Sequence, residues 1–315
     1  MNLTSLASAI TPLDLRSCLI SHRNQLIFEH YRDQHISNEI AKINSCTKSI
    51  LSALICIAMD QGLLPQPQTR ITSFFPQLAN DPDPRKQEIT LQHLLTMTAG
   101  FNWTEFGGQK SFPRMTRSSN WVDFVLEQQL SDSPGTRMEY NSGVSQLLSA
   151  ILVQVIGMST ARYAELYLFK PLGIESYQWE SDPQGIHTGG YGLRLLPSDM
   201  LKFGQLYLDH GKWNNGQLIS KELITRSVQP SIAVDAPRRG LYAWHWWADS
   251  FLDTVNDSGS GGTSFEYFYA RGYGGQFIHV IPSLDTVVVL TNDKRKKEQH
   301  PGDVFHEYIA PLLVK

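Results

Sequence analysis

Cysteine is scarce in this chain. Its 315 residues include three, Cys18, Cys46 and Cys56, and their spacing does not match a zinc-binding motif. An odd number of thiols also excludes a framework that pairs every cysteine in a disulfide. We therefore expect buried, reduced thiols and no metal site.

The chain also lacks a large excess of positive or negative charge. The 27 Lys and Arg residues nearly balance the 30 Asp and Glu residues, which gives a net charge of −3. One basic run stands out, Lys294-Arg295-Lys296-Lys297. It could meet an anionic partner, but it fits a solvated turn after a strand better. We expect neither a nucleic acid nor a membrane surface as a partner.

Long apolar runs are missing as well. No stretch reaches the roughly 18 consecutive apolar residues of a membrane span. The first residues carry no positive charge before Arg16 and no apolar segment long enough for a secretory signal. If Met1 is the natural start, the protein is expected to be cytoplasmic. Hydrophobic residues still make up 41% of the chain, as in an ordinary globular protein.

The two ends of the chain have the pattern of a β-sheet. Residues 15–21 and 25–31 are short β-rich runs separated by His22-Arg23-Asn24, which predicts a hairpin. Near the C-terminus the pattern returns in residues 264–270, 276–281 and 286–291, with turns rich in Gly and Pro between them.

The middle of the chain has helical spacing instead. Start and stop signals predict helices over residues 91–97, 121–129, 144–156, 161–169 and 198–208, the fourth closed by Pro171. One further helix, residues 49–59, is apolar at almost every position and must be surrounded by protein. Together these patterns predict an α+β fold with a terminal antiparallel sheet, flanking helices and an inserted helical region.

Ser45-Cys46-Thr47-Lys48 opens this apolar helix and is the single Ser-x-x-Lys in the chain. Residues three apart lie on one helix face, so the Lys48 amine can reach the Ser45 hydroxyl. The free N–H groups at the helix start favour negative charge there. Ser45 as nucleophile requires Lys48 to take its proton, for which burial must lower the lysine pKa. The alternative is an ordinary N-cap serine and a surface lysine.

Two further segments are candidates for the same site. Tyr140 lies on a turn that leads into the helix 144–156, where its phenol could relay protons if an ammonium lies beside it. It could equally pack against that helix. Residues 271–276, Arg-Gly-Tyr-Gly-Gly-Gln, precede a strand and could present a backbone N–H to an oxyanion, or form a simple hairpin loop.

Other catalytic signatures are absent from the sequence. We find no Gly-x-Ser-x-Gly elbow, no His-Glu-x-x-His and no phosphate-binding glycine loop. Cys46 could be a thiol nucleophile, but a small buried cysteine is the better interpretation. The aromatic residues of 242–247 could line a pocket or fill the core.

In combination, these motifs resemble the serine β-lactamase and penicillin-binding-protein superfamily, in its class C-like branch of esterases and 6-aminohexanoate-dimer hydrolases. The likeness covers nearly the whole chain. Beyond the motifs it includes residues 89–100, 189–194 and 199–204. It implies a β-lactamase/D,D-peptidase-like fold. We expect a sheet domain of residues 1–62 and 212–315, a mostly helical domain of residues 63–211, and an active site between them.

The resemblance assigns Ser45, Lys48 and Tyr140 as catalytic residues. It places the third motif on Tyr273-Gly274-Gly275 and implies oxyanion donors at the backbone of Ser45 and Gln276, with Tyr273, Gly275 and Ser142 beside the substrate. Two positions depart from the family pattern. Ser142 stands where Asn is usual, and Tyr273 stands where a strand lysine helps to hold the substrate carboxylate in lactamases and D,D-peptidases.

A neutral ester or a short amide therefore suits the site better than a penicillin or peptidoglycan. The sequence predicts a serine hydrolase that acts on a small-molecule ester or amide through an acyl-enzyme on Ser45, with Lys48 and Tyr140 moving the proton and no cofactor. The alternatives are a β-lactamase or D,D-peptidase, and a relative that has lost catalysis and only binds a ligand.

Overall fold

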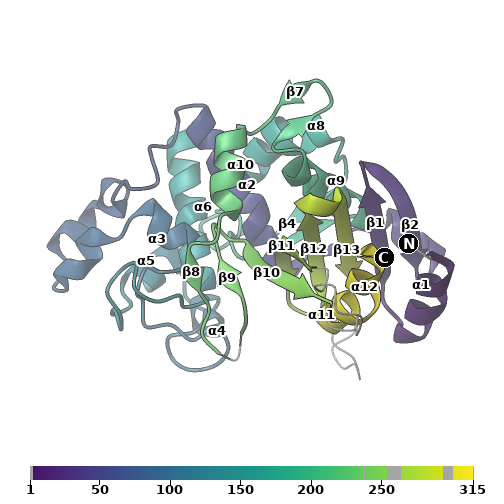
Figure 1. The fold of residues 1–315 in the computed structure, drawn as a ribbon. Helices are drawn as coiled ribbons and strands as arrows, with labels where there is room; N and C mark the ends of the chain where they lie inside the picture. Colours follow the sequence, from purple (N-terminus) through teal and green to yellow (C-terminus); the bar gives the residue numbers. More distant parts are fainter. Residues whose placement is uncertain (1–2, 237, 254–263, 294–300, 315) are drawn as a thin grey trace.

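Strands from the two ends of the chain lie side by side in one sheet (Figure 1). The computed structural model describes residues 3–236, 238–253, 264–293 and 301–314. Its main sheet has eight antiparallel strands in the order β2-β1-β13-β12-β11-β10-β9-β8. These are β1 (Ser17–His22), β2 (Gln25–Tyr31), β8 (Ile232–Ala233), β9 (Leu241–Tyr242), β10 (Trp247–Leu252), β11 (Ser264–Gly272), β12 (Gln276–Ile281) and β13 (Thr286–Thr291). The five predicted strands are confirmed.

Both faces of the sheet centre are covered. Every residue of β12 and β13 is buried. Helix α9 (Pro197–Leu208) packs on β1, β12 and β13. Another contact on β12 comes from the C-terminal helical segment, where the ring of Phe305 stacks on His279 at 4.0 Å. This explains why these strands are apolar on both sides rather than alternating.

The central helix α2 (Thr47–Asp60) begins just after Ser45 and is buried from Thr47 through Ala58. It packs against α6 (Ser142–Ile156), α10 (Lys221–Val228) and β11. The prediction of a helix enclosed by protein is confirmed. This enclosure holds the first turn of α2, with Ser45 before it and Lys48 in it, in a fixed position.

The other helices follow most of the predicted signals. Thr90 and Asn120 cap α3 (Leu91–Leu95) and α5 (Trp121–Leu126), both of which end earlier than predicted. Helix α6 starts at Ser142 rather than 144, because the Asn141 side chain accepts hydrogen bonds from the N–H groups of Gly143 and Val144.

The prediction that Pro171 closes a helix was wrong. The chain stays helical through α7 (Thr160–Ala164), a π-helical turn (Glu165–Phe169) and α8 (Lys170–Leu172). Pro171 lies in the first turn of α8, where a missing N–H costs little. The helical stretch ends instead at Gly173, whose φ is 64°.

The remaining α-helices and strands of the described residues are short. They are the helices α1 (Leu3–Ile10), α4 (Phe112–Met115), α11 (Pro301–Val304) and α12 (Ala310–Leu313), and the strands β3 (Ala41–Lys42), β4 (Gln178–Trp179), β5 (Leu193–Leu195), β6 (Lys212–Trp213) and β7 (Gly216–Gln217). Within residues 63–211, α9 packs on β1, β12 and β13 of the main sheet. The division into two domains stays a prediction.

All three cysteines are buried and free, whereas the basic run Lys294–Lys297 lies outside the described residues. Among the described residues no single helix is long and apolar enough to cross a membrane. Helix α6 and the stretch Thr160–Leu172 together reach that length, but they meet at a bend of 72°. Residues 142–152 of α6 are also buried within the protein.

The enclosure of α2 predicts a large cost for a cavity there. Leu54 is fully buried in α2, so Leu54→Ala is expected to lower the free energy of unfolding by about 2–5 kcal/mol. Leu63→Ala, at a site that is 44% exposed just after the helix, is the control and should change it by less than about 1 kcal/mol. Urea unfolding monitored by circular dichroism measures both. Equal losses would contradict the buried position of α2.

Candidate active site

Ser45 and Lys48 come together at the start of α2. A 3-10 helical turn (Asn44–Cys46) leads directly into the helix, and Ser45 lies half-buried on that turn. Lys48, one turn further, is 1% exposed. Its Nζ lies 3.3 Å from Ser45 Oγ. The spacing of three residues therefore produces the contact that the sequence predicted.

The Lys48 Nζ has two other oxygen partners. It donates to Gly190 O at 2.8 Å and to Ser142 Oγ at 2.9 Å. A carbonyl oxygen can only accept, and Ser142 Oγ gives its own proton to the carboxylate of Glu105. Both of these contacts therefore use an N–H of Lys48. The remaining valence of Nζ, either a third N–H or a lone pair, faces Ser45 Oγ.

Glu105 is a buried member of this network that the sequence did not reveal. One carboxylate oxygen accepts from the N–H of Ser142 at 2.9 Å and from the Trp103 indole at 2.8 Å, and the other accepts from the Ser142 hydroxyl. Ser142 is the first residue of α6, so the carboxylate also occupies the positive end of that helix. The only sequence feature at this position is an acidic residue close to two aromatic ones, Trp103 and Phe106.

Gly190 lets its chain segment approach the lysine. A Cβ at this position would lie 3.0 Å from Ser142 Oγ and 3.2 Å from Lys48 Nζ, so a larger side chain would crowd both partners. Residues 189–194 entered the sequence analysis through the family resemblance, without a role. The structure shows that the Gly190 carbonyl is a direct partner of Lys48.

Tyr140 lies beside the same Lys48 amino group. Lys48 Nζ is 4.8 Å from the centre of the Tyr140 ring, and Trp247 of β10 stacks on this ring at 5.8 Å. Within the part of the chain that the structure describes, the phenol oxygen makes no hydrogen bond with Ser45 or Lys48. The structure thus brings Tyr140 next to the pair through its ring, while the proton-relay role stays a prediction.

The segment 272–276 lies against the turn that carries Ser45. Asn44 Nδ2 donates to Tyr273 O at 2.7 Å, and Cys46 Sγ donates to Gln276 O at 3.5 Å. Gly272 is required here, because a Cβ would lie 2.3 Å from the carbonyl oxygen of Ile43. The Gln276 side chain turns away to the backbone of Asn292. Any contribution of Gln276 to an oxyanion site must therefore come from its backbone.

His245 holds the helices behind the site together. Its Nδ1 bonds to Leu95 O at 3.0 Å, and since a carbonyl only accepts, Nδ1 carries the proton and Nε2 accepts from Ser145 at 3.0 Å. Its own carbonyl accepts from Ser49 at 2.7 Å. Burial, and then the charge of Lys48, lower the pKa of His245 to about 3, so the ring is neutral.

Two alternatives raised by the sequence are decided by burial. Burial raises the pKa of the Cys46 thiol, which argues against a thiolate nucleophile. The aromatic residues of 242–247 are all buried, and the Trp246 ring packs on Phe203 and Phe268. They fill the core, and Trp247 among them also stacks on Tyr140.

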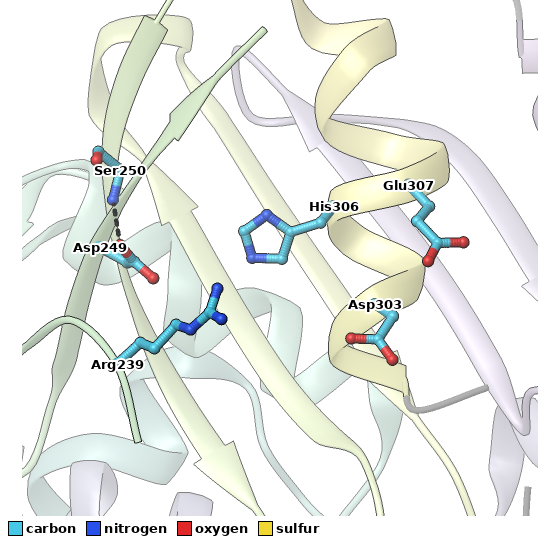
Figure 2. Close-up of a pocket in the computed structure, with 6 residues that line it drawn as sticks. All are labelled: Arg239, Asp249, Ser250, Asp303, His306 and Glu307. Atoms are coloured by element: carbon cyan, nitrogen blue, oxygen red, sulfur yellow. Dashed lines mark hydrogen bonds between the residues drawn. The ribbon is translucent and has the colours of Figure 1, made fainter. Parts of the chain in front are cut away.

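A polar cavity lies elsewhere on the molecule, between β10 and the C-terminal helical segment (Figure 2). It has a volume of about 400 Å³, and neither Ser45, Lys48 nor Tyr140 lines it. Its lining consists of Arg239, Asp249, Ser250, Asp303, His306 and Glu307. Although three carboxylates and a histidine gather here, the described residues contain no group of His, Cys, Asp or Glu arranged to hold a metal ion.

The beta-lactamase family model matches residues 17–306, which is most of the chain and includes every residue of the site. The chain belongs to the beta-lactamase family. A beta-lactamase from Yersinia enterocolitica is 21% identical over 245 residues, which are 71% of this chain and 61% of the relative. The chain thus spans less than two thirds of the length of that curated relative.

Solved structures share the fold of this beta-lactamase-family chain. A protein from Bacillus anthracis assigned as a 6-aminohexanoate-dimer hydrolase superposes with a TM-score of 0.79 at 19% identity, covering 98% of this chain and 81% of its own. The octameric penicillin-binding protein homologue from Pyrococcus abyssi reaches 0.77 at 19% identity, covering 100% and 78%. A class C beta-lactamase from Rhodobacter sphaeroides reaches 0.65 at 17% identity, covering 92% and 93%. The predicted family and α+β fold are confirmed.

The neutral His245 predicts a dependence of stability on pH. Since the unfolded ring has a pKa near 6.5 and the folded ring near 3, the unfolded chain binds the proton first as the pH falls. This contribution to the free energy of unfolding is complete above pH 6.5 and is lost toward pH 3. His279, which burial and His306 also lower to about 3, acts in the same direction.

His245→Asn tests this directly, because Asn tolerates the φ of 57° at this position. The slope of the free energy of unfolding between pH 6.5 and 3 should fall by up to about 1.4 kcal/mol per pH unit in the variant. The slope that remains comes from His279 and from the paired carboxylates, whose pKa values are also lowered in the folded protein. Urea unfolding across that pH range gives the slope. A slope identical to that of the unaltered protein would refute a neutral buried His245.

The network around Glu105 predicts a specific cost for removing its charge. In Glu105→Gln an amide N–H₂ replaces one accepting oxygen, so the three donors from Trp103 and Ser142 can no longer all be accepted. The free energy of unfolding should fall by about 1–3 kcal/mol. Glu127→Gln, on the exposed surface of the chain, is the matched control. Thermal and urea unfolding measure both, and equal stability of the two variants would contradict the network.

Proposed function

We propose that this protein is a serine hydrolase that cleaves a carboxylic ester or a short amide through an acyl-enzyme on Ser45. The observation that carries the proposal is the placement of Lys48 Nζ. Two of its N–H groups are committed to Gly190 O and Ser142 Oγ, and its remaining valence is directed at Ser45 Oγ, 3.3 Å away. A neutral amine held in this way presents its lone pair to the serine hydroxyl.

The reaction follows from this arrangement. Lys48 takes the Ser45 proton while Ser45 Oγ forms a bond with the substrate carbonyl carbon. The tetrahedral intermediate then collapses, the bond to the alcohol or amine breaks, and this leaving group departs with a proton that returns from Lys48, with Tyr140 as the relay. Water attacks the acyl-enzyme by the same route in reverse, which releases the acid and restores the Ser45 hydroxyl.

The oxyanion of the intermediate would be held at the start of α2. The backbone N–H of Ser45 and that of Gln276 are the proposed donors, with Gly275, Tyr273 and Ser142 beside the substrate. The close contact of the 272–276 segment with the Ser45 turn supports this assignment, because Asn44 and Cys46, on either side of Ser45, donate hydrogen bonds to the carbonyls of Tyr273 and Gln276. The positive end of α2 favours the same negative charge.

Ester or short-amide specificity is proposed from the third motif. Tyr273 replaces the lysine with which β-lactamases and D,D-peptidases bind a substrate carboxylate at this strand, and its side chain is 64% exposed. β-Lactamase activity remains the alternative, because the Yersinia relative and the Rhodobacter neighbour are both named as β-lactamases. The Bacillus neighbour, in contrast, is named as a hydrolase of the 6-aminohexanoate dimer. A catalytically inactive binding protein is less consistent with an intact Ser45–Lys48 pair.

The nucleophile is tested by covalent labelling. A fluorophosphonate probe should label the folded protein at the peptide that contains Ser45, and p-nitrophenyl butyrate should be hydrolysed. In Ser45→Ala both signals should fall at least about a thousandfold, because the nucleophile is gone. Ser133→Ala, which removes an exposed serine, should keep both.

An unlabelled Ser45 in folded protein, or full esterase activity in Ser45→Ala, would overturn the proposal. Nitrocefin distinguishes the alternative within the same reaction class. Turnover of nitrocefin faster than that of any ester or amide in a broad panel would favour a β-lactamase.

A further inference from the structure

The guanidinium of Arg238 reaches the Tyr140 ring from a different part of the chain. Arg238 lies on the loop between β8 and β9, and its guanidinium carbon is 5.1 Å from the centre of the ring. Lys48 Nζ is 4.8 Å from the same centre. The Arg238 guanidinium carbon and Lys48 Nζ are therefore at most about 10 Å apart, which places the guanidinium beside the Ser45–Lys48 pair.

Arg238 makes no ion pair within the described residues, where no carboxylate oxygen lies within 4.0 Å of its guanidinium. Arg137, which is also half-buried, pairs by contrast with both Asp132 and Glu139. Arg238 is itself half-buried, so its charge has lost part of its water without gaining a carboxylate in return. A guanidinium in this state is suited to bind an anion from outside the protein.

Two exposed aromatic rings form an apolar surface at the site. Phe106 and Tyr273 are each 64% exposed, and their ring centres are 6.1 Å apart. Phe106 follows Glu105, which holds Ser142, and the Tyr273 carbonyl is bound by Asn44, the residue before Ser45. Both rings are thus attached to the reactive centre and offer it an apolar contact surface.

We propose that the substrate carries a carboxylate or similar anionic group that binds Arg238, and an apolar part that lies on Phe106 and Tyr273. This inference rests on the proposed function and gives it a substrate class. Tyr273 carries no positive charge, but Arg238 brings one to the site from the loop between β8 and β9. The site therefore selects an anionic ester or amide whose charged group lies at Arg238 and not at the strand position of Tyr273. Arg238 acts here as a specificity-determining residue and takes no part in bond breaking.

Matched pairs of esters test the proposal. One pair places the charge in the acyl part, as the mono-p-nitrophenyl ester of adipic acid against p-nitrophenyl hexanoate. The other places it in the leaving group, as 4-butyryloxybenzoate against phenyl butyrate. The measured quantity is the ratio of kcat/KM for the anionic ester to that for the neutral ester, which cancels general losses of activity.

In the unaltered protein at least one pair should favour the anion, and this preference should weaken as NaCl rises from about 50 mM to about 500 mM. Arg238→Ala and Arg238→Gln should lower the ratio about tenfold or more, since a charge-assisted hydrogen bond is lost. Arg238→Lys should restore part of it. Arg239→Ala, one residue away in the separate polar cavity of Figure 2, removes the same charge and should keep the ratio.

The inference is overturned if the unaltered protein hydrolyses both members of each pair and the ratio is unchanged in Arg238→Ala and Arg238→Gln. It also fails if Arg239→Ala lowers the ratio as much, because the effect would then be one of net charge. These results leave labelling of Ser45 by the fluorophosphonate intact. Loss of the proposed function itself looks different, since Ser45 then stays unlabelled and no ester is hydrolysed in a Ser45-dependent manner.

Discussion

The site is organised by one constraint, the need of a buried lysine for oxygen partners. Lys48 Nζ is enclosed by protein and can be accommodated only where acceptors converge on it. They come from the turn before α2, from the first residue of α6 and from the segment at Gly190. The hydrogen bonds of the Lys48 amino group thus fix the relative positions of three segments that are far apart in sequence. Glu105 completes the set, because its negative charge orients the Ser142 hydroxyl so that the hydroxyl can accept.

The residues that the sequence predicted are those whose relation is local. Ser45 and Lys48 come together because they are one helical turn apart. The apolar character of residues 49–59 predicted that the helix is buried, and the burial encloses Lys48. The strand pattern at the chain ends likewise followed from alternation and turn residues. Tyr140 and the Tyr273 segment needed the family resemblance, since each is ambiguous when considered alone.

The residues that were missed are those whose role exists only in the folded protein. Glu105 lies on an irregular loop, His245 adopts a left-handed backbone within an aromatic stretch, and Gly190 acts through its carbonyl, which every residue has. Nothing in their spacing indicates which helices they will meet. Pro171 shows the converse, because a residue that usually ends a helix was accommodated at the start of a new helical turn. Which outcome a proline has depends on packing that the local pattern does not contain.

The pairing of β1 with β13 has a consequence for when the Ser45 site can form. Ser17 bonds to Thr291 across 274 residues of sequence, and the segment 272–276 that borders Ser45 belongs to the last strands of the chain. During synthesis, Ser45 and Lys48 therefore leave the ribosome long before the strand edge that borders them. Such long-range closure is slow and comes late in folding. A nascent chain that has not yet reached β12 would carry Ser45 without the segment that borders it, so the topology makes assembly of this site depend on strands that are synthesised late.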